Sequence, residues 1–263
     1  MGRTLLGVAG FPVSHSRSPA MHNAALSELG LDWLYVPVPV PPELFEQTAR
    51  ALGRAGFRGL NVTVPHKLAA HDLADSRSPA AEAIGAVNTL TFEGGAIGAD
   101  NTDAAGLLDA IGESPAGRTA LVLGAGGAAR AAVWALRGAG AAEVSVWNRT
   151  AERAAAVASD LGARPVARPE AADLVVNCTA VGLGGGEIGD LALEGVEAGS
   201  VVVDMVYGGG VTPVQGWAER GGSRFVGGLE VLVRQGARSL ERWTGRPPPV
   251  GVMRAAAGAE LDS

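Results

Sequence analysis

The chain has 263 residues, of which 47% are hydrophobic and 18% charged, and its formal net charge at pH 7 is -6. This composition supports a folded core and excludes a disordered chain, and the acidic balance disfavours a nucleic-acid partner held by a basic face. The single cysteine, Cys178, excludes an intramolecular disulfide and a multi-cysteine metal site, and the four histidines form no HExxH motif, so we predict no bound metal.

The hydropathy pattern gives no sign of targeting to a membrane. The first residues lack an apolar stretch of the length that a signal peptide needs, and no run reaches the roughly 18 apolar residues of a membrane span. We therefore expect a cytoplasmic protein.

The first hundred residues alternate short apolar runs with helix-like segments. The segment 33–40 is rich in proline, which indicates an edge strand because proline cannot donate a ladder hydrogen bond. The strands predicted in this half are 4–10, 33–40, 58–64 and 87–93, and the helices are 19–30, 42–56 and 66–74.

The second half has a different character. Residues 117–150 read as strand, glycine turn, helix and strand, which is the length of one βαβ unit. The apolar runs within 172–180 and 200–207 are nearly continuous, as expected for parallel strands covered on both faces. Helices are predicted at 151–162 and 229–245. The fold class that follows is α/β.

A glycine-rich turn follows the apolar run ALVL and precedes a helical stretch. Its sequence, GAGGAA from residue 124, matches GxGxxA, in which glycines allow a tight turn and close approach of a pyrophosphate. A glycine turn with no ligand is the alternative, which the strand–turn–helix–strand setting disfavours. The residues predicted to contact the cofactor here are Gly124, Ala125, Gly126, Gly127 and Ala128.

The end of the next strand indicates which dinucleotide binds. NAD sites usually carry an acidic residue at this point, whereas arginine accommodates the 2′-phosphate of NADP. Here the strand 143–147 runs into Asn148, Arg149 and Thr150, and Arg153 follows one helical turn later. We therefore predict NADP(H), the alternative being solvated arginines at a helix start.

Lys67 is the only lysine of the chain, because 20 of the 21 basic residues are arginine. Arginine stays protonated in proteins, whereas a lysine amine can lose its proton. A step between a hydroxyl and a carbonyl needs a proton to move at oxygen, and a lysine with a nearby carboxylate suits that task. The alternative is a surface lysine that survived a bias toward arginine.

Polar residues collect where the predicted strands end. They are Ser14, Ser16, Ser18, Asn61, Thr63, Asn88, Thr89, Asn101, Thr102 and Asp103. Each has a structural alternative, since Asp103 and the serines could cap helices and Asn88 could bond a loop. Together, hydroxyls and amides suit a polyol that carries a carboxylate. We expect His15, His66 and His71 to be surface or loop residues without partners.

Seven motifs follow one another between residue 14 and about residue 236: SHSRSPAMHNAAL, NVTVPHK, AVNTL, GADNTDAAG, GAGGAAR, NRT and GGLEVLVRQG. This ordered set is far more specific than the glycine turn alone, and it resembles the signatures of the shikimate dehydrogenase family. The resemblance implies NADP-dependent reduction of 3-dehydroshikimate to shikimate, on the route to chorismate and aromatic amino acids.

The resemblance also implies a role for individual residues. Lys67 and Asp103 would form the catalytic pair, and Ser14 and Ser16 would bind the substrate carboxylate. Further substrate contacts would come from Thr63, Asn88 and Gln235, and the nicotinamide would lie near Met205, Tyr207 and Gly228. Gln235 lies about 60° from the apolar stripe of its predicted helix, a border position from which it could reach a cleft.

The family fold implies two domains. A discontinuous α/β substrate domain, formed by 1–101 and 238–263 and completed by C-terminal helices, surrounds a Rossmann-type NADP-binding domain at 102–237. Closure of the two domains would exclude water. The segment 181–195 departs from the family pattern because it is rich in glycine, and a loop beside the cofactor is one interpretation. The oligomeric state is open, with a homodimer as the state to test.

Three other functions compete with this interpretation. A quinate or dual quinate/shikimate dehydrogenase would be expected to carry an acid where Arg149 stands. A non-catalytic sensor of the same ligands would have no need for both Lys67 and Asp103. An amino-acid or folate dehydrogenase of similar plan would not need the serines of SHSRSP.

Overall fold

The computed structural model describes residues 3–183, 186–194, 196–208 and 210–259. The chain divides into two compact units, one formed by Met1–Thr102 with Val233–Ser263 and the other by Asp103–Leu232. Residues 1, 2 and 260–263 of the expected substrate domain lie outside the described residues. No described helix combines the length and the apolar character that a membrane crossing needs.

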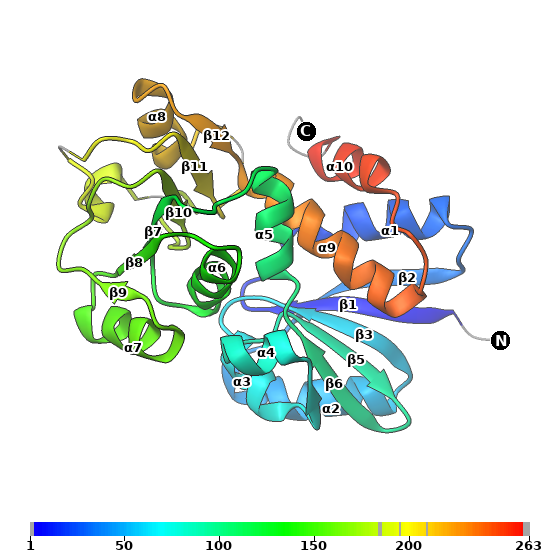
Figure 1. Cartoon of the computed structure of the whole chain (residues 1–263). Helices are drawn as coiled ribbons and strands as arrows, with labels where there is room; N and C mark the ends of the chain where they lie inside the picture. The colour runs from blue at the N-terminus through cyan, green and yellow to red at the C-terminus, as the bar shows by residue number, and fades with distance from the viewer. Residues whose placement is uncertain (1–2, 184–185, 195, 209, 260–263) are drawn as a thin grey trace. The chain divides into compact units, whose positions relative to one another are not determined.

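The first unit is built on a mixed sheet of six strands in the order β2-β1-β3-β5-β6-β4 (Figure 1). β1 is parallel to both of its neighbours, whereas β5 is antiparallel to β3 and β6. The proline-rich strand lies at the edge, as its sequence predicts. The strands are β1 (Thr4–Gly10), β2 (Trp33–Pro39), β3 (Phe57–Val62), β4 (Ser76–Arg77), β5 (Thr89–Glu93) and β6 (Ala96–Asp100).

Helices cover both faces of this sheet (Figure 1). On one face, Phe45 and Leu73 of the α2–α3 side pack with Leu60 and Leu90 of the sheet. On the other, α1 packs against α10 and β2. The helical segments are α1 (Ser18–Glu28), η1 (Pro42–Leu44), α2 (Phe45–Arg54), α3 (Lys67–Leu73), α4 (Pro79–Ile84), the part of α9 (Gly228–Thr244) from Val233 onward, and α10 (Val250–Ala259).

The second unit has a parallel sheet in the order β12-β11-β10-β7-β8-β9. From β9 inward this is the order 3-2-1-4-5-6 of the Rossmann fold. Its elements are α5 (Asp103–Ile111), β7 (Thr119–Leu123), α6 (Gly127–Gly138), β8 (Glu143–Trp147), α7 (Ala151–Leu161), β9 (Arg164–Pro165), β10 (Leu174–Asn177), η2 (Ile188–Leu191), β11 (Val201–Asp204), α8 (Pro213–Arg220) and β12 (Arg224–Val226).

The parallel sheet is buried on both faces, which explains its continuous apolar strands. Val122 and Val176 belong to the core under α5, α6 and α7, while Leu121 and Val175 belong to a second core with Trp217 of α8. The α/β class and the Rossmann-type sheet predicted from the sequence are confirmed. Several short elements were not predicted, among them β4 and β12, because two or three residues carry no readable period.

The segment 181–195 is in part anchored. Residues 184, 185 and 195 lie outside the described residues, but η2 occupies Ile188–Leu191, and Leu191 and Leu193 are buried in the core with Trp217.

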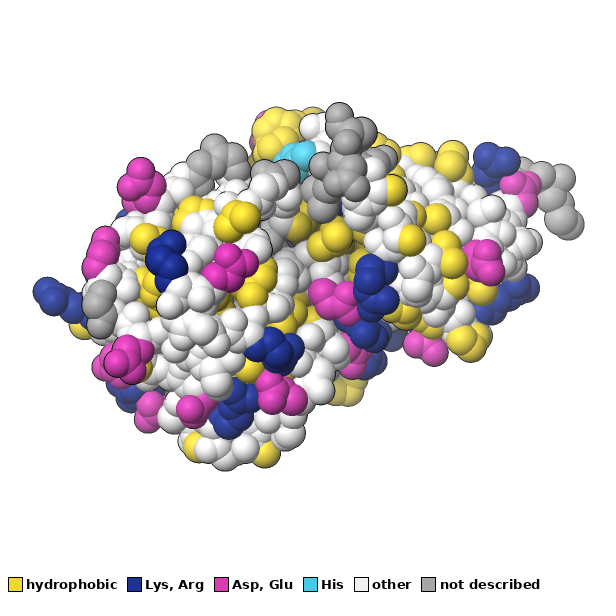
Figure 2. Space-filling model, turned by 90° about the horizontal axis from the view of Figure 1, so that it is seen from above, with side chains coloured by type: hydrophobic (Ala, Val, Ile, Leu, Met, Phe, Trp, Pro, Cys, Tyr) yellow, Lys and Arg dark blue, Asp and Glu magenta, His cyan; other side chains and the backbone are white. Residues whose placement is uncertain are grey.

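On the face seen in Figure 2, acidic and basic side chains are interspersed rather than separated by sign.

Candidate active site

In the first unit, the residues predicted for substrate binding and catalysis, apart from Gln235 on α9, follow one edge of the mixed sheet. Because β1 and β3 are parallel and β5 runs the other way, the ends of β1 and β3 and the start of β5 meet at that edge. Ser14 and Ser16 follow β1, Thr63 and Lys67 follow β3, and Asn88 immediately precedes β5. Ser14 is exposed, while Ser16, Thr63 and Lys67 are half-buried.

Backbone hydrogen bonds join these three segments. The Phe11 amide after β1 donates to the Val64 carbonyl after β3 at 3.0 Å. Lys67 is the first residue of α3, and its carbonyl accepts a hydrogen bond of 2.9 Å from the amide of Val87, the neighbour of Asn88. The lone lysine is therefore fixed at its backbone to the segment that carries a predicted substrate residue.

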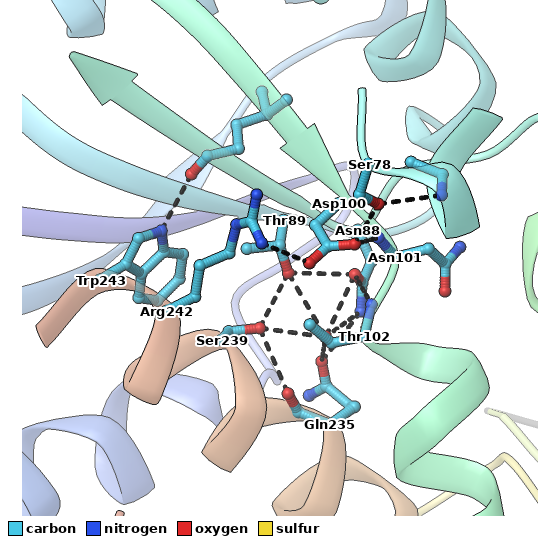
Figure 3. Close-up of polar contacts among 12 residues, drawn as sticks. Ser78, Asn88, Thr89, Asp100, Asn101, Thr102, Gln235, Ser239, Arg242 and Trp243 are labelled. Carbon is cyan, nitrogen blue, oxygen red and sulfur yellow. Dashed lines mark hydrogen bonds and ion pairs between the residues drawn. The ribbon is translucent and has the colours of Figure 1, made fainter. Parts of the chain in front are cut away.

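Asn88 is the centre of a buried polar network (Figure 3). Its Nδ2 donates to Gln235 Oε1 at 3.1 Å and to Thr102 Oγ1 at 2.9 Å, and its Oδ1 accepts from the Thr102 amide at 2.8 Å. The exposed fractions of Asn88 and Gln235 are 2% and 8%. Two predicted substrate residues that lie 147 positions apart in the sequence are thus brought to hydrogen-bond distance.

A second part of the network contains a residue that the sequence analysis missed. Ser239 of α9 is fully buried, and its Oγ lies 2.8 Å from Thr89 Oγ1 and accepts from Asn61 Nδ2 at 3.0 Å. The Tyr35 hydroxyl donates to Asn61 Oδ1 at 2.8 Å. Ser239 follows Gln235 by four residues, so both lie on one helix face, and that spacing is the signal that could have found it.

The prediction that His66 is a surface or loop residue without a partner is wrong. His66 is 2% exposed, its Nε2 donates to the Val40 carbonyl at 2.8 Å, and its ring stacks on Phe45 with centroids 4.5 Å apart. Burial lowers the pKa of this imidazole. The partners were invisible in the sequence because the nearest lies more than 20 positions away. His15 is exposed, as expected.

His71 also has a partner, contrary to the expectation. It is half-buried, and its Nδ1 lies 3.2 Å from a carboxylate oxygen of the adjacent Asp72. The Asp72 carboxylate is exposed, so solvent screens this contact and it contributes little to stability.

In the second unit, the glycine turn has the geometry that its sequence predicts. Gly124 has φ of +110°, and its amide donates to the Trp147 carbonyl at 2.7 Å. A Cβ at Gly124 would lie 3.0 Å from the Cys178 carbonyl oxygen, so both the backbone conformation and the available space favour glycine. Gly126 caps the N-terminus of α6, where amide groups can receive an anion.

The segment after β8 presents two arginines. Asn148 Nδ2 donates to the Thr150 carbonyl at 2.9 Å, and Thr150 is the N-cap residue of α7. Arg149 and Arg153 are exposed, and within the described part of the chain neither guanidinium forms an ion pair or a side-chain hydrogen bond. Their charges are therefore available to a phosphate group.

The residues predicted near the nicotinamide are also close together. The Met205 amide donates to the Asn177 carbonyl at 2.9 Å, and a Cβ at Gly228 would lie 2.5 Å from the Val206 carbonyl oxygen. Gly228 thus packs backbone to backbone against the segment that begins at Met205. Tyr207 is half-buried in the same segment.

Asp103 is the first residue of α5 and is 5% exposed. It belongs to the second unit, whereas Lys67 belongs to the first. The predicted catalytic pair therefore has one member in each unit, and Asp103 directly follows Thr102 of the buried polar network.

These observations define a class of protein. A Rossmann-ordered parallel sheet with a glycine turn, two available arginines after β8 and a separate unit with a polar network are the features of a dinucleotide-dependent α/β oxidoreductase.

Comparison with known families identifies which one. Three family models match the chain: the shikimate dehydrogenase substrate binding domain over residues 8–90, shikimate / quinate 5-dehydrogenase over 107–180, and the shikimate 5'-dehydrogenase C-terminal domain over 228–257. The chain belongs to the shikimate dehydrogenase family.

Individual relatives match nearly the full length. The shikimate dehydrogenase (NADP(+)) of Citrifermentans bemidjiense is 44% identical over 99% of this chain and 97% of its own. The crystal structure of the Thermus thermophilus shikimate 5-dehydrogenase in complex with NADP(H) and shikimate has 42% identity and a TM-score of 0.87, covering 97% of this chain and 99% of that one.

A relative with a different name has the same plan. The ligand-free 5-ketofructose reductase of a Gluconobacter species is 30% identical, with a TM-score of 0.85 and coverage of 99% of both chains. The fold alone therefore does not select the substrate, and the choice of one must rest on the site.

Proposed function

We propose that this chain catalyses the reversible, NADP-dependent interconversion of 3-dehydroshikimate and shikimate. Its membership of the family, and curated relatives named as NADP(+) enzymes over nearly the whole length, support this activity. The observation that carries the proposal is the contact between Asn88 and Gln235, because it joins two predicted substrate residues from distant parts of the chain in one buried network.

The glycine turn and the arginines after β8 fit the cofactor. The turn at Gly124 favours glycine through its backbone conformation and its limited space, and it precedes the N-terminus of α6, which suits a pyrophosphate. Arg149 and Arg153 would hold the 2′-phosphate, since their charges have no partner among the described side chains. When bound, NADP(H) supplies or accepts the hydride at the carbonyl carbon.

Lys67 would transfer the proton in the same reaction step, and Asp103 would orient the substrate hydroxyl. In the reduction direction, the Lys67 ammonium would donate a proton to the carbonyl oxygen, and in the oxidation direction the neutral amine would accept it. Asp103 would accept a hydrogen bond from the substrate hydroxyl and orient it. An arginine at position 67 could not alternate between these states.

The remaining polar residues would select the substrate. Ser14 and Ser16 follow β1 and would bind the carboxylate through hydroxyl and amide groups, and Thr63, Asn88 and Gln235 would bind ring hydroxyls. Asn88 and Gln235 are held by the buried network before any ligand arrives, which reduces the entropy lost on binding. A cytoplasmic location and a homodimer are further parts of this proposal.

A matrix of substrates and cofactors tests the proposal. We expect initial rates to be highest with shikimate and NADP+, and at least about tenfold lower when NAD+ replaces NADP+, because a charge-assisted contact with phosphate is lost. Quinate as the preferred substrate would favour the quinate/shikimate alternative, and NADPH oxidation only with 5-ketofructose would indicate the reductase activity of the Gluconobacter relative.

Binding of shikimate and NADP+ without turnover in any combination would contradict the proposal and favour a non-catalytic sensor. Calorimetric titration of each ligand separately distinguishes that outcome from a protein that fails to bind.

A further inference from the structure

A buried carboxylate that the proposed chemistry does not use lies at the end of β11. Asp204 is fully buried. Its Oδ1 accepts hydrogen bonds from Asn177 Nδ2 at 2.8 Å and from the Val206 amide at 3.1 Å, and its Oδ2 accepts from Thr212 Oγ1 at 2.7 Å. Burial raises the pKa of this carboxyl group in spite of the three donors.

The three donors come from three different segments of the second unit. Asn177 ends β10, Val206 follows β11, and Thr212 is the N-cap of α8, where its hydroxyl accepts from the Gln215 amide at 3.1 Å. Asp204 therefore fixes both ends of the connection between β11 and α8.

Asn177 extends the same network to the segment after β10. Its Oδ1 accepts from the Thr179 amide at 3.1 Å and from Thr179 Oγ1 at 2.7 Å. Its own orientation is set by the bond that its Nδ2 donates to Asp204. The carboxylate is thus the common acceptor that holds the connections after two adjacent strands.

These connections lie where a Rossmann sheet binds its ligand. β10 pairs with β7 in parallel, and the strand order reverses between them. β8 and β9 follow β7 toward one edge of the sheet, whereas β11 and β12 follow β10 toward the other. Ligands of such sheets bind outside the carboxyl ends of the strands at this reversal. Asn177 and Asp204 are the terminal residues of the two strands on one side of it.

The segment that Asp204 holds is the one assigned to the nicotinamide half of the cofactor. Met205 is bonded to the Asn177 carbonyl, Val206 is bonded to Asp204, and both pack against Gly228. The adenosine half, in contrast, is assigned to the glycine turn and to Arg149 and Arg153, which have no bond to this carboxylate in the described structure.

We propose that Asp204 is a positioning residue that sets the segment 205–207 against the nicotinamide, and that it acts through Asn177, Val206 and Thr212 rather than by touching the substrate. This inference rests on the proposed NADP function. A buried carboxylate carries a large desolvation cost, and an asparagine offers one acceptor oxygen where Asp204 offers two. Two acceptors are needed because three donors converge from separate segments.

The first measurement is hydrogen–deuterium exchange of the peptide that contains Met205 and Val206 in the ligand-free protein. In Asp204→Ala the Val206 amide loses its acceptor, so we expect its exchange to accelerate about tenfold or more. The control is Asp173→Ala, which removes a carboxylate that accepts from the Thr119 amide and hydroxyl at 2.9 Å each before β10 begins. Asp173→Ala should leave exchange at 205–206 unchanged.

The second measurement compares ligands. The dissociation constant of 2′,5′-ADP, which lacks the nicotinamide, should change by less than about twofold in Asp204→Ala, while the kcat for shikimate oxidation falls about tenfold or more because the donor and acceptor are misaligned. The kcat of Asp204→Asn should lie between the values for the wild type and Asp204→Ala. If Asp204→Ala does not fold, Thr212→Val against Thr212→Ser replaces the comparison.

The proposal would be overturned if the variants kept the exchange rate and the kcat of the wild type. It would also be overturned if their affinity for 2′,5′-ADP fell together with kcat. If the wild type does not bind 2′,5′-ADP or NADP+ at all, the proposed function fails instead, and the exchange result still reports on the Asp204 contacts.

Discussion

In the second unit the residues assigned to the adenosine half of the cofactor lie within the 30 positions from Gly124 to Arg153, whereas in the first unit two residues assigned to the substrate lie 147 positions apart. The cofactor half is built from one strand–turn–helix–strand unit, so its chemistry is local in the sequence. The substrate half is assembled by tertiary contacts between a sheet edge and α9. The comparison teaches that local motifs specify a cofactor, while a substrate site depends on how distant segments pack.

The largest effect on stability that we expect from a change of conditions lies in the first unit. His22 is fully buried, its Nδ1 donates to the Ser18 carbonyl at 2.9 Å, and its ring stacks on Tyr35 at 4.2 Å. Burial lowers its pKa to about 4, below the ordinary value of 6.5. Between pH 4 and pH 6.5 the unfolded chain binds more protons than the folded chain. The contribution of His22 to the free energy of unfolding is therefore complete above pH 6.5 and is lost as the pH falls toward 4.

The loss should amount to about 3 kcal/mol for a shift of this size. Chemical denaturation between pH 7 and 4 measures it, with His22→Gln as the non-titrating comparison. Equal slopes for the wild type and His22→Gln would show that this imidazole does not titrate differently in the folded state.

The second prediction sharpens the contrast in the cofactor half. Arg149→Gln should weaken NADP+ binding by about 10- to 100-fold, the range for loss of one charge-assisted contact, and leave NAD+ binding nearly unchanged. Arg220→Gln, on the exposed last turn of α8, is the matched control. Isothermal titration of both dinucleotides measures the effect, and an equal loss for NAD+ would assign Arg149 to another part of the cofactor.

The smallest effect tests the long-range contact of the substrate half. In a double-mutant cycle, Asn88→Ala and Gln235→Ala should be coupled by about 1 kcal/mol in the free energy of unfolding, because they share a buried hydrogen bond. The exposed Glu46–Arg50 pair at 3.1 Å is the comparison, with an expected coupling below about 0.5 kcal/mol. Additive effects at Asn88 and Gln235 would mean that the contact contributes nothing specific.

The same comparison explains what the sequence could predict. β1 and β8 begin and end at the predicted residues, and the edge position of β2 followed from its prolines. Asn88 and Gln235 could be named through the family resemblance, but their mutual bond could not, because no local pattern encodes it. Ser239 and Asp204 were missed for the same reason, although each leaves a trace, one at helical spacing from Gln235 and the other at the end of an apolar strand.

His66 is a residue whose prediction from the sequence was wrong, in contrast to Ser239 and Asp204, which were missed. Its neighbours in the sequence gave it no partner, so a surface or loop residue was expected, but the Val40 carbonyl just after β2 and the ring of Phe45 contact it. Burial of a polar side chain depends on contacts that arise only when the elements pack.

The lone lysine carries the central claim, that a proton moves at position 67. The decisive measurement is the kcat of shikimate oxidation by NADP+ for the wild type, Lys67→Arg and Lys67→Ala, with the dissociation constant of shikimate determined for each. Loss of general acid–base catalysis predicts that kcat falls by about 10²- to 10⁴-fold in both variants while shikimate still binds. Wild-type turnover in Lys67→Arg would contradict the claim, because an arginine cannot exchange the proton at this position.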